Sequence, residues 1–452
     1  FFSYYKSRLL LFTAIYMICV FGYYKVQGMK DQLLQNKSLY LYFGATAVFA
    51  LFALLSTLFS DYKGIAVWGG PERCEGIVMI LIYLLIMLYA MWAYLHKPEF
   101  KFILLPLGVL TLITGFLGVF QFWGHDLFTT EFGQALIIPE VYRSQGELKM
   151  LFEEGKIYGT MYHYNYMGSF GAMMVPLFLV LALFLKERKQ QIFCGVLAVV
   201  ALFVLLGSTS RAGIIGLVLA AVCFLIFFAR KLAQHSKATL GCVAVLVLFV
   251  FVVNMATGGL ALARIPSLLN DMKAMVSSSD VDYHNEIPVR NIDIQQDKAV
   301  FTMQDDTLTI QKNSNHQLVF TAGDGQTVTA PGEDCSFTAG KYKMELQYLP
   351  VNDVKTPFLG IYVGDSIEFI LGLYDDGFAL VDSRMNKIAY EEAPSMGFQG
   401  KEKLGSARGY IWSRSLPVLM DSIFIGKGPD TFFAEFPQGD LLGKLYAYDT
   451  TQ

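Results

Sequence analysis

One arginine lies between two long apolar runs and is the first residue for which chemistry has to be considered. Arg211 follows Ser208-Thr209-Ser210, and the flanking runs 192–207 and 212–228 contain no charged residue. Bringing a guanidinium toward the hydrocarbon core of a membrane is costly, so an arginine at this depth indicates a functional site. Its planar set of donors suits phosphate and carboxylate. Two interpretations stay open: Arg211 binds an anionic substrate, or it ends a helix and reaches the lipid headgroups.

Further cations occur in stretches that we expect at the same membrane face as Arg211, namely Arg73, Arg408, Arg414 and Lys427. The apolar runs beside Arg211 offer it no acidic partner. Cations gathered without carboxylates fit a diphosphate, or a similar anion, at the level of the headgroups. If a lipid diphosphate is the donor of a transfer reaction, the arginines balance the charge of the leaving group without a metal ion.

The composition indicates a polytopic membrane protein: 54% of the residues are hydrophobic, 16% are charged, and the mean hydropathy is +0.45. The net charge of -3 does not indicate a nucleic-acid partner. The sequence has no phosphate-binding loop, no zinc-protease motif and no nucleophile elbow. The six cysteines form neither a metal-binding nor a disulfide pattern. We therefore predict no metal and no cofactor.

Eight segments are apolar over about 16–21 residues, close to the length that crosses a bilayer. They are Leu9–Tyr24, Leu39–Leu58, Ile77–Leu95, Ile103–Trp123, Tyr166–Leu185, Ile192–Gly207, Ala212–Phe228 and Ala238–Ala256. The loops 25–37, 97–101, 186–189 and 230–237 are basic, so we expect them in the cytoplasm. The Arg211 turn then lies outside. Because the first span would run inward, we expect a further helix before Phe1 and a chain cut at both ends.

Residues 259–405 differ in character from the apolar spans. They begin with a segment expected to lie as a surface helix, Leu260–Val276, and continue as short alternating strands from about residue 287. With 21 Asp and Glu against 12 Lys and Arg, this region is a solvated acidic domain. The predicted fold class is an all-α polytopic membrane bundle (1–258) with an inserted extracytoplasmic β-sandwich-like domain (259–405). Residues 406–452 form a return segment at the membrane interface.

The return segment carries several polar residues at helical or turn spacing. Arg408 and Trp412 are four apart and share a helical face, as in an interfacial anchor or a binding site. Gly426-Lys427-Gly428-Pro429-Asp430 permits a tight turn that can bring backbone N–H groups near an anion. Farther upstream, His163 is either a general base or a polar loop residue.

The motifs follow one another in an order that resembles the superfamily of O-antigen ligases and O-antigen polymerases. Gly159-Thr160 with Asn165 precedes one helix, Ser208-Thr-Ser210-Arg211-Ala-Gly opens another, and Arg408…Trp412…Gly426-x-Gly-Pro-Asp430-Thr-Phe follows. The resemblance covers the chain from about Ile77 onward and does not include the β domain. It implies a metal-independent, inverting glycosyltransferase on the outer face of the cytoplasmic membrane of a bacterium.

The resemblance also implies partners and roles. The donor is an undecaprenyl-diphosphate-linked glycan, and the acceptor is a glycan, a lipid or a protein. Arg211 and Arg408 bind and neutralise the diphosphate as catalytic residues. Substrate-binding roles extend to Arg73, Asn165, Ser210, Trp412, Arg414, Lys427 and Asp430. A histidine that acts on the acceptor is expected after residue 452, so the base is unassigned.

Two other functions remain open. A transporter or flippase for an anionic lipid-linked glycan would use the same cations, but the eight spans carry no charge and show no repeat. A membrane-anchored receptor would bind glycan through the β domain and would leave Arg211 and Arg408 without a role.

Overall fold

The computed structural model describes residues 2–27, 37–71, 73–96, 99, 101–138, 155–161, 163–234, 236–256, 258–259, 262, 264–276, 282–313, 317–330, 332, 334–351, 354–383 and 385–451. Its contacts divide the chain into two compact units. One unit is residues 98–273, and the other combines residues 1–97 with 274–452. The predicted membrane region 1–258 is therefore shared between the two units.

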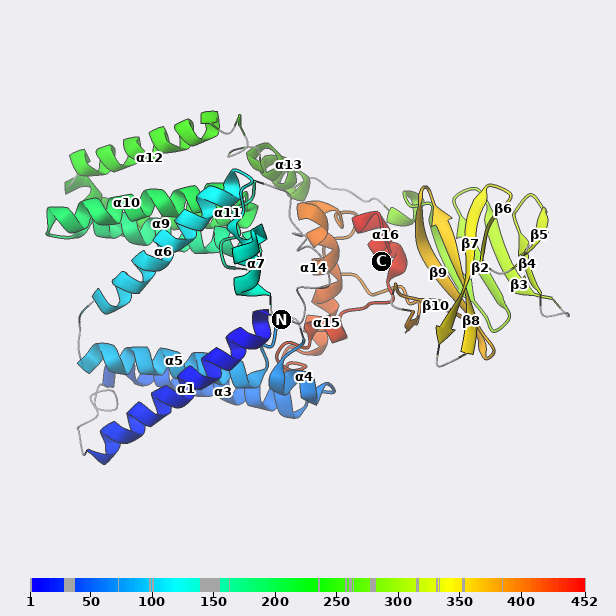
Figure 1. Cartoon of the computed structure of the whole chain (residues 1–452), viewed down its shortest axis with the longest axis horizontal. Helices are drawn as coiled ribbons and strands as arrows, with labels where there is room; N and C mark the ends of the chain where they lie inside the picture. The colour runs from blue at the N-terminus through cyan, green and yellow to red at the C-terminus, as the bar shows by residue number, and fades with distance from the viewer. Residues whose placement is uncertain are drawn as a thin grey trace. The chain divides into compact units, whose positions relative to one another are not determined.

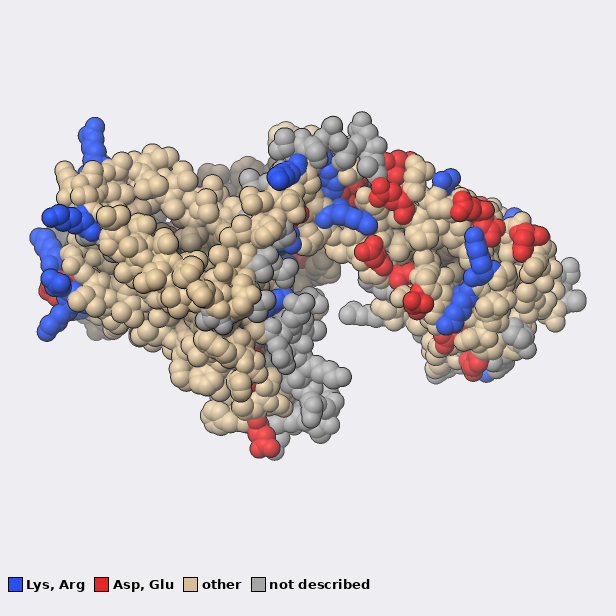
Figure 2. Space-filling view, turned by 90° about the horizontal axis from the view of Figure 1, so that it is seen from above, with Lys and Arg blue, Asp and Glu red and all other residues tan. Residues whose placement is uncertain are grey.

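Seven helices in the described part of the chain are long and apolar enough to cross a membrane. They are α1 (Phe2–Val26), α3 (Tyr40–Leu58), α5 (Ile77–His96), α6 (Lys101–Phe122), α9 (Tyr164–Phe184), α10 (Arg188–Gly207) and α11 (Arg211–Gln234). The eighth predicted span is also a helix, α12 (Ser236–Ala256), but its apolar stretch, Thr239–Met255, is shorter. Seven of the eight predicted spans are therefore confirmed, within the described residues, as helices long and apolar enough to cross a membrane. Figure 2 shows the flanks of the long helices on this face largely free of Lys and Arg.

The unit 98–273 has its core between α9 and α10, with α6 and α11 packed against them (Figure 1). Glycines let α9 and α11 approach closely. A Cβ on Gly213 would lie 2.8 Å from the backbone carbonyl of Gly168. One turn farther along both helices, Gly216 faces Ala172. Because the contacts advance in the same direction on both helices, α9 and α11 are parallel and begin side by side.

Shorter helices complete this unit. They are η2 (Leu127–Thr129), α7 (Glu131–Ile137) and α13 (Arg264–Val276), whose last residues enter the second unit. The helix predicted over 260–276 is present over 264–276, and its position at a membrane surface stays a prediction; residues 260, 261 and 263 lie outside the described residues.

The second unit contains an antiparallel β domain of two sheets, each a meander. One sheet has the order β1 (Val289–Ile294), β2 (Lys298–Met303), β3 (Thr307–Lys312), β4 (Leu318–Thr321) and β5 (Thr327–Thr329). The other has the order β11 (Lys387–Ile388), β10 (Gly377–Val381), β9 (Ser366–Tyr374), β8 (Val354–Val363), β7 (Tyr342–Val351) and β6 (Cys335–Ala339).

The two sheets bury alternate side chains in one common core. In β2, Ala299, Phe301 and Met303 point inward while the residues between them face outward. Phe301 packs on Phe369 of β9, with 5.7 Å between the ring centres. The core extends beyond the sheets to a helix at the end of the chain through Leu442. The predicted β domain is therefore confirmed as a separate antiparallel domain.

The remaining elements of the second unit are short or bent. They are η1 (Lys37–Leu39), α4 (Lys63–Trp68), η4 (Tyr283–Asn285), α14 (Leu404–Asp421), α15 (Phe432–Glu435) and α16 (Leu441–Tyr448). The helix α16 joins the β-domain core through one face and contacts α14 through another. The return segment is therefore packed against folded protein along much of its length.

The close approach of α9 and α11 predicts a steric test. We expect Gly213→Ala to lower stability by about 1–3 kcal/mol, because its methyl group would overlap the Gly168 backbone. Gly216→Ala is the matched control: its Cβ would lie at an ordinary 3.5 Å from Ala172, and alanine favours the helix. Thermal unfolding of both purified variants in detergent measures the difference. Equal unfolding temperatures would contradict the proposed crossing.

Candidate functional site

Arg211 opens α11 directly after a strained turn. Thr209 has a left-handed backbone, with φ of 51°, and Ser210 is fully buried. The Ser210 hydroxyl accepts a hydrogen bond from the Gly213 N–H at 3.2 Å and caps the helix. Ser210, predicted to bind substrate, is therefore a helix cap. It can affect a ligand by fixing the position at which α11 starts, and with it the position of Arg211.

Arg211 forms an ion pair with a carboxylate of the same chain. Its Nη1 lies 2.5 Å from Oδ2 of Asp271 in α13, and the two side chains are 27% and 32% exposed. The expectation of a cation without a carboxylate partner is therefore wrong for Arg211, because an element 60 residues away supplies one. The pair shows that the geometry at the start of α11 accommodates a carboxylate-sized anion.

Asn165 lies in the first turn of α9, beside the start of α11. Its backbone N–H donates to Nδ1 of His163 at 3.1 Å, so the imidazole caps α9. An imidazole that accepts at Nδ1 in its neutral form carries its proton on Nε2. His163 cannot take a proton at Nε2 while it holds that cap, which favours a structural role over that of a general base.

A buried glutamine fixes the loop that leads into α9. Gln121 of α6 accepts from the N–H groups of Tyr158 and Gly159 at 3.2 and 2.8 Å, and its amide donates to the Gly159 carbonyl. The N–H of fully buried Ile157 donates to the Gly207 carbonyl at the end of α10. These bonds tie the starts of α9 and α11 to the ends of α6 and α10.

Arg408 in the other unit also begins a regular helix after a strained turn. Gly405, Ser406 and Ala407 all have left-handed backbones, so the regular part of α14 starts at Arg408. For Ser406 and Ala407 this conformation costs roughly 1–2 kcal/mol per residue. The turn is held from both sides: the Tyr410 N–H donates to the Glu402 carbonyl at 2.9 Å, and α14 passes closely over that segment.

The predicted common face of Arg408 and Trp412 is present, and both side chains are exposed. Within the part of the chain that the structure describes, no hydrogen bond or ion pair engages the Arg408 guanidinium. Trp412 packs on Phe398, with ring centres 5.2 Å apart. Arg408 is therefore a cation available to an external anion.

Arg414 lies on the opposite, buried side of α14. Its side chain is 1% exposed, its Nε lies 2.9 Å from Asp440 Oδ2, and its Nη1 lies 3.4 Å from Glu402 Oε1. Burial alone lowers the pKa of Arg414, but the Asp440 carboxylate outweighs this effect and holds the pKa above its usual value. We therefore assign Arg414 to the protein interior and withdraw it from the substrate-binding set, because its donors bind carboxylates.

The glycine-rich turn 426–430 packs against the ends of α3 and α4. The Gly428 N–H donates to Ser56 Oγ at 2.9 Å, and a Cβ on Gly428 would lie 2.7 Å from Ser60 Oγ. Gly428 has φ of 115°, which also favours glycine. The Gly-x-Gly spacing therefore serves close backbone packing, and the Gly428 N–H is not directed at a ligand.

The same turn brings three of the predicted residues into one region. Asp430 Oδ2 accepts from the N–H groups of Gly70 and Glu75, at 2.7 and 3.3 Å, and so closes the loop that carries exposed Arg73. Lys427, in the turn itself, lies 3.9 Å from Glu435. Asp430 is thus a structural clamp that joins the turn carrying Lys427 to the loop carrying Arg73.

Sequence reasoning missed Asp271, which lies on an amphipathic helix, and Arg8 of α1, whose guanidinium lies 5.7 Å from the Trp68 ring of α4. It also missed the carboxylates of Glu402 and Asp440. An arginine with acidic residues 12 and 26 positions away gives no local signal, because only folding brings these groups together.

Neither a protein family model, nor a curated protein, nor a solved structure matches this chain. Across the described residues, no group of three or more His, Cys, Asp or Glu side chains could hold a metal ion. The chemistry that the described geometry supports is the binding of an anion by arginine at helix starts.

The buried cluster around Arg414 predicts a large effect on stability. Arg414→Met leaves the carboxylates of Asp440 and Glu402 buried without a cation, so we expect a loss of about 3–5 kcal/mol. Lys427→Met removes a partly exposed cation from Glu435 and should cost only about 0–1 kcal/mol. Thermal unfolding of both variants in the same detergent tests this. Similar unfolding temperatures for the two variants would refute the structural role of Arg414.

Proposed function

We propose that this chain is a membrane glycosyltransferase of the O-antigen ligase and polymerase type. It transfers a glycan from undecaprenyl diphosphate to a glycan, lipid or protein acceptor on the outer face of a bacterial cytoplasmic membrane. The observation that carries the proposal is the shared setting of Arg211 and Arg408. Each begins a regular helix after a turn with left-handed, non-glycine backbone: Thr209 lies two residues before Arg211, and Ser406 and Ala407 directly precede Arg408.

This setting suits an anionic leaving group. The start of a helix carries a partial positive charge and backbone N–H groups without helical partners, and both favour anions. Guanidinium adds a full charge and paired donors that match phosphate oxygens. Strained backbone is maintained where the surrounding structure holds it in place, as the bonds around Ala407 do, and such strain clusters at functional sites.

The proposed reaction is an inverting substitution. A hydroxyl oxygen of the acceptor forms a bond to the anomeric carbon of the first sugar, and the bond from that carbon to the diphosphate oxygen breaks. The electron pair leaves with undecaprenyl diphosphate, and Arg211 and Arg408 stabilise the added negative charge. The acceptor hydroxyl proton passes to a base that is not assigned among the described residues.

Removal of either arginine should abolish transfer. We expect Arg211→Ala and Arg408→Ala each to lower the transfer rate at least about 100-fold, the scale of losing a charge-stabilising group in a transition state. Arg211→Lys should restore little activity, because an ammonium cannot reproduce the paired donors. The assay uses purified protein in detergent with an undecaprenyl-diphosphate oligosaccharide and EDTA, and it follows the glycan product.

Asn165→Ala and Trp412→Ala, beside the two arginines, should weaken transfer less in the same assay. Specific binding of the lipid by folded wild-type protein without turnover would exclude the transferase function and favour transport. Unchanged transfer by Arg211→Ala would remove Arg211 from the mechanism.

The pairing of Arg211 with Asp271 makes a separate prediction. The Asp271 carboxylate competes with the diphosphate for Arg211, so Asp271→Asn should lower the donor KM by a factor of about 1.4 to 5, the range for a partly exposed pair of about 0.2–1 kcal/mol. Asp61→Asn is the control, because it removes the same charge from an exposed position. A raised KM in Asp271→Asn would instead assign the carboxylate to donor binding.

A further inference from the structure

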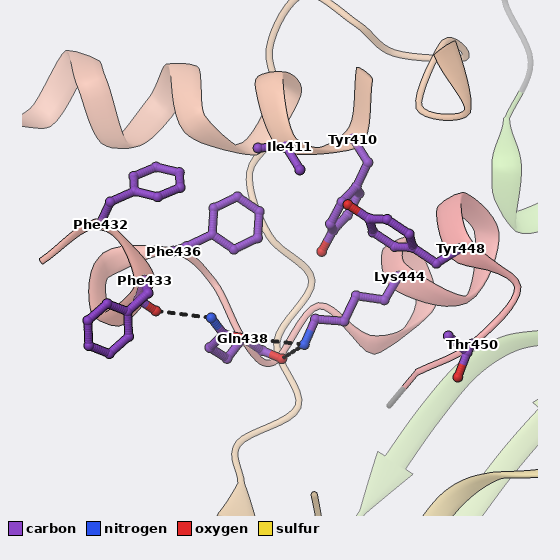
Figure 3. A pocket seen from close by; sticks show the side chains of 9 residues that line it. All are labelled: Tyr410, Ile411, Phe432, Phe433, Phe436, Gln438, Lys444, Tyr448 and Thr450. Atoms are coloured by element: carbon purple, nitrogen blue, oxygen red, sulfur yellow. Dashed lines mark hydrogen bonds between the residues drawn. The ribbon is translucent and has the colours of Figure 1, made fainter. Parts of the chain in front are cut away.

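A concave region in the unit formed by residues 1–97 and 274–452 lies beside α14, the helix that carries Arg408. It is a cavity of about 520 Å³, a size typical of sites for small ligands. Figure 3 shows how α14, α15 and α16 contribute its walls. The lining residues are mostly aromatic, with a few polar groups: Tyr410, Ile411, Phe432, Phe433, Phe436, Gln438, Lys444, Tyr448 and Thr450.

One wall is formed by aromatic rings in edge-to-face or tilted contact. Phe436 packs on Phe432 and on Tyr410, with ring centres 5.5 and 6.0 Å apart, and Tyr410 packs on Tyr448 at 5.8 Å. Tyr410 is buried, whereas Phe432 and Tyr448 remain 51% and 43% exposed. The contacts fix the rings relative to one another, so the wall is a pre-formed apolar surface.

The opposite side of the cavity is polar. Lys444 extends along it, and its ammonium donates to the Gln438 backbone carbonyl at 2.9 Å and to the Gln438 side-chain oxygen at 3.3 Å (Figure 3). An ammonium has three donors, and no described carboxylate forms an ion pair with this one. Burial lowers the pKa of Lys444, against the opposing effect of Asp440 one turn earlier. A ligand oxygen at the remaining donor would stabilise the charged form.

We propose that this cavity binds a pyranose sugar. One face of a pyranose is a set of C–H groups that packs on the negative face of an aromatic ring, and its rim carries hydroxyls that accept and donate hydrogen bonds. The aromatic wall matches the first property, and Lys444 with the Tyr448 hydroxyl matches the second. A hydrocarbon chain would desolvate the Tyr448 hydroxyl and the remaining Lys444 donor without offering either a hydrogen bond. A phosphate would meet mainly apolar rings.

The position of the cavity connects it with the arginine site. Ile411, which lines the cavity, lies three residues after Arg408 on α14, so the two side chains are neighbours on the helix surface. Phe433, on another wall, is the residue that a Cβ on Gly70 would contact, at the base of the Arg73 loop. The inference rests on the proposed function in one respect. Under that function, the sugar in the cavity belongs to the glycan that is transferred.

The test measures sugar binding directly and without turnover. Purified protein in nanodiscs, free of glycoside detergents, is applied to an array of neutral, N-acetylated and acidic oligosaccharides. We expect the protein to be retained by at least one of these classes of oligosaccharide. Phe436→Ala and Lys444→Met should each weaken this retention about tenfold or more, while Phe424→Ala, an 86% exposed phenylalanine outside the cavity, should leave it unchanged.

Two outcomes would overturn the assignment. One is the absence of retention on every class by monodisperse wild-type protein, and the other is retention that neither cavity variant weakens. Loss of undecaprenyl phosphate binding in both variants, with sugar retention intact, would assign the cavity to lipid instead. Arg211→Ala and Arg408→Ala should keep sugar binding but lose transfer, so failure of the transferase proposal is distinguishable from failure of the sugar site.

Discussion

The buried charge cluster around Arg414 is the interaction on which the second unit depends. Its guanidinium bonds to Asp440 at the start of α16 and approaches Glu402 before α14 and the Tyr283 hydroxyl at the entry to the β domain. A cation in the interior is stable only if these partners stay in place. The cluster therefore connects three segments and fixes the rotation of α14, which determines that Arg408 faces outward.

Close backbone contacts explain the small residues of the recognisable motifs. Gly168 and Gly213 allow α9 and α11 to begin side by side, and Gly428 allows the last turn to rest on Ser60 and Ala66. Ser210 and Asp430 are engaged in hydrogen bonds that hold these contacts. In both units, these glycine, serine and aspartate residues mainly hold the backbone in place. In the proposed site, their function is to fix the position of a nearby cation.

The two arginines differ in electrostatic state although their settings are alike. Arg211 is paired with a carboxylate from α13, whereas Arg408 has no anionic partner among the described residues. An anion that binds Arg211 must displace Asp271, whereas Arg408 can bind an anion without losing a partner among the described residues. Under the proposed function, the affinity for the donor is therefore set partly by α13, which carries Asp271.

The sequence by itself determined the apolar helices, the antiparallel domain and the shared face of Arg408 and Trp412. These follow from local periodicity: apolar runs of bilayer length, alternation along strands such as β3, and a spacing of four residues on a helix. Only the tertiary structure decided that Arg414 is buried, that Arg211 has a carboxylate partner and that Asp430 clamps a loop 360 residues away. The physical reason is that burial and ion pairing depend on which distant segments meet. The spacing of residues along one segment does not carry that information.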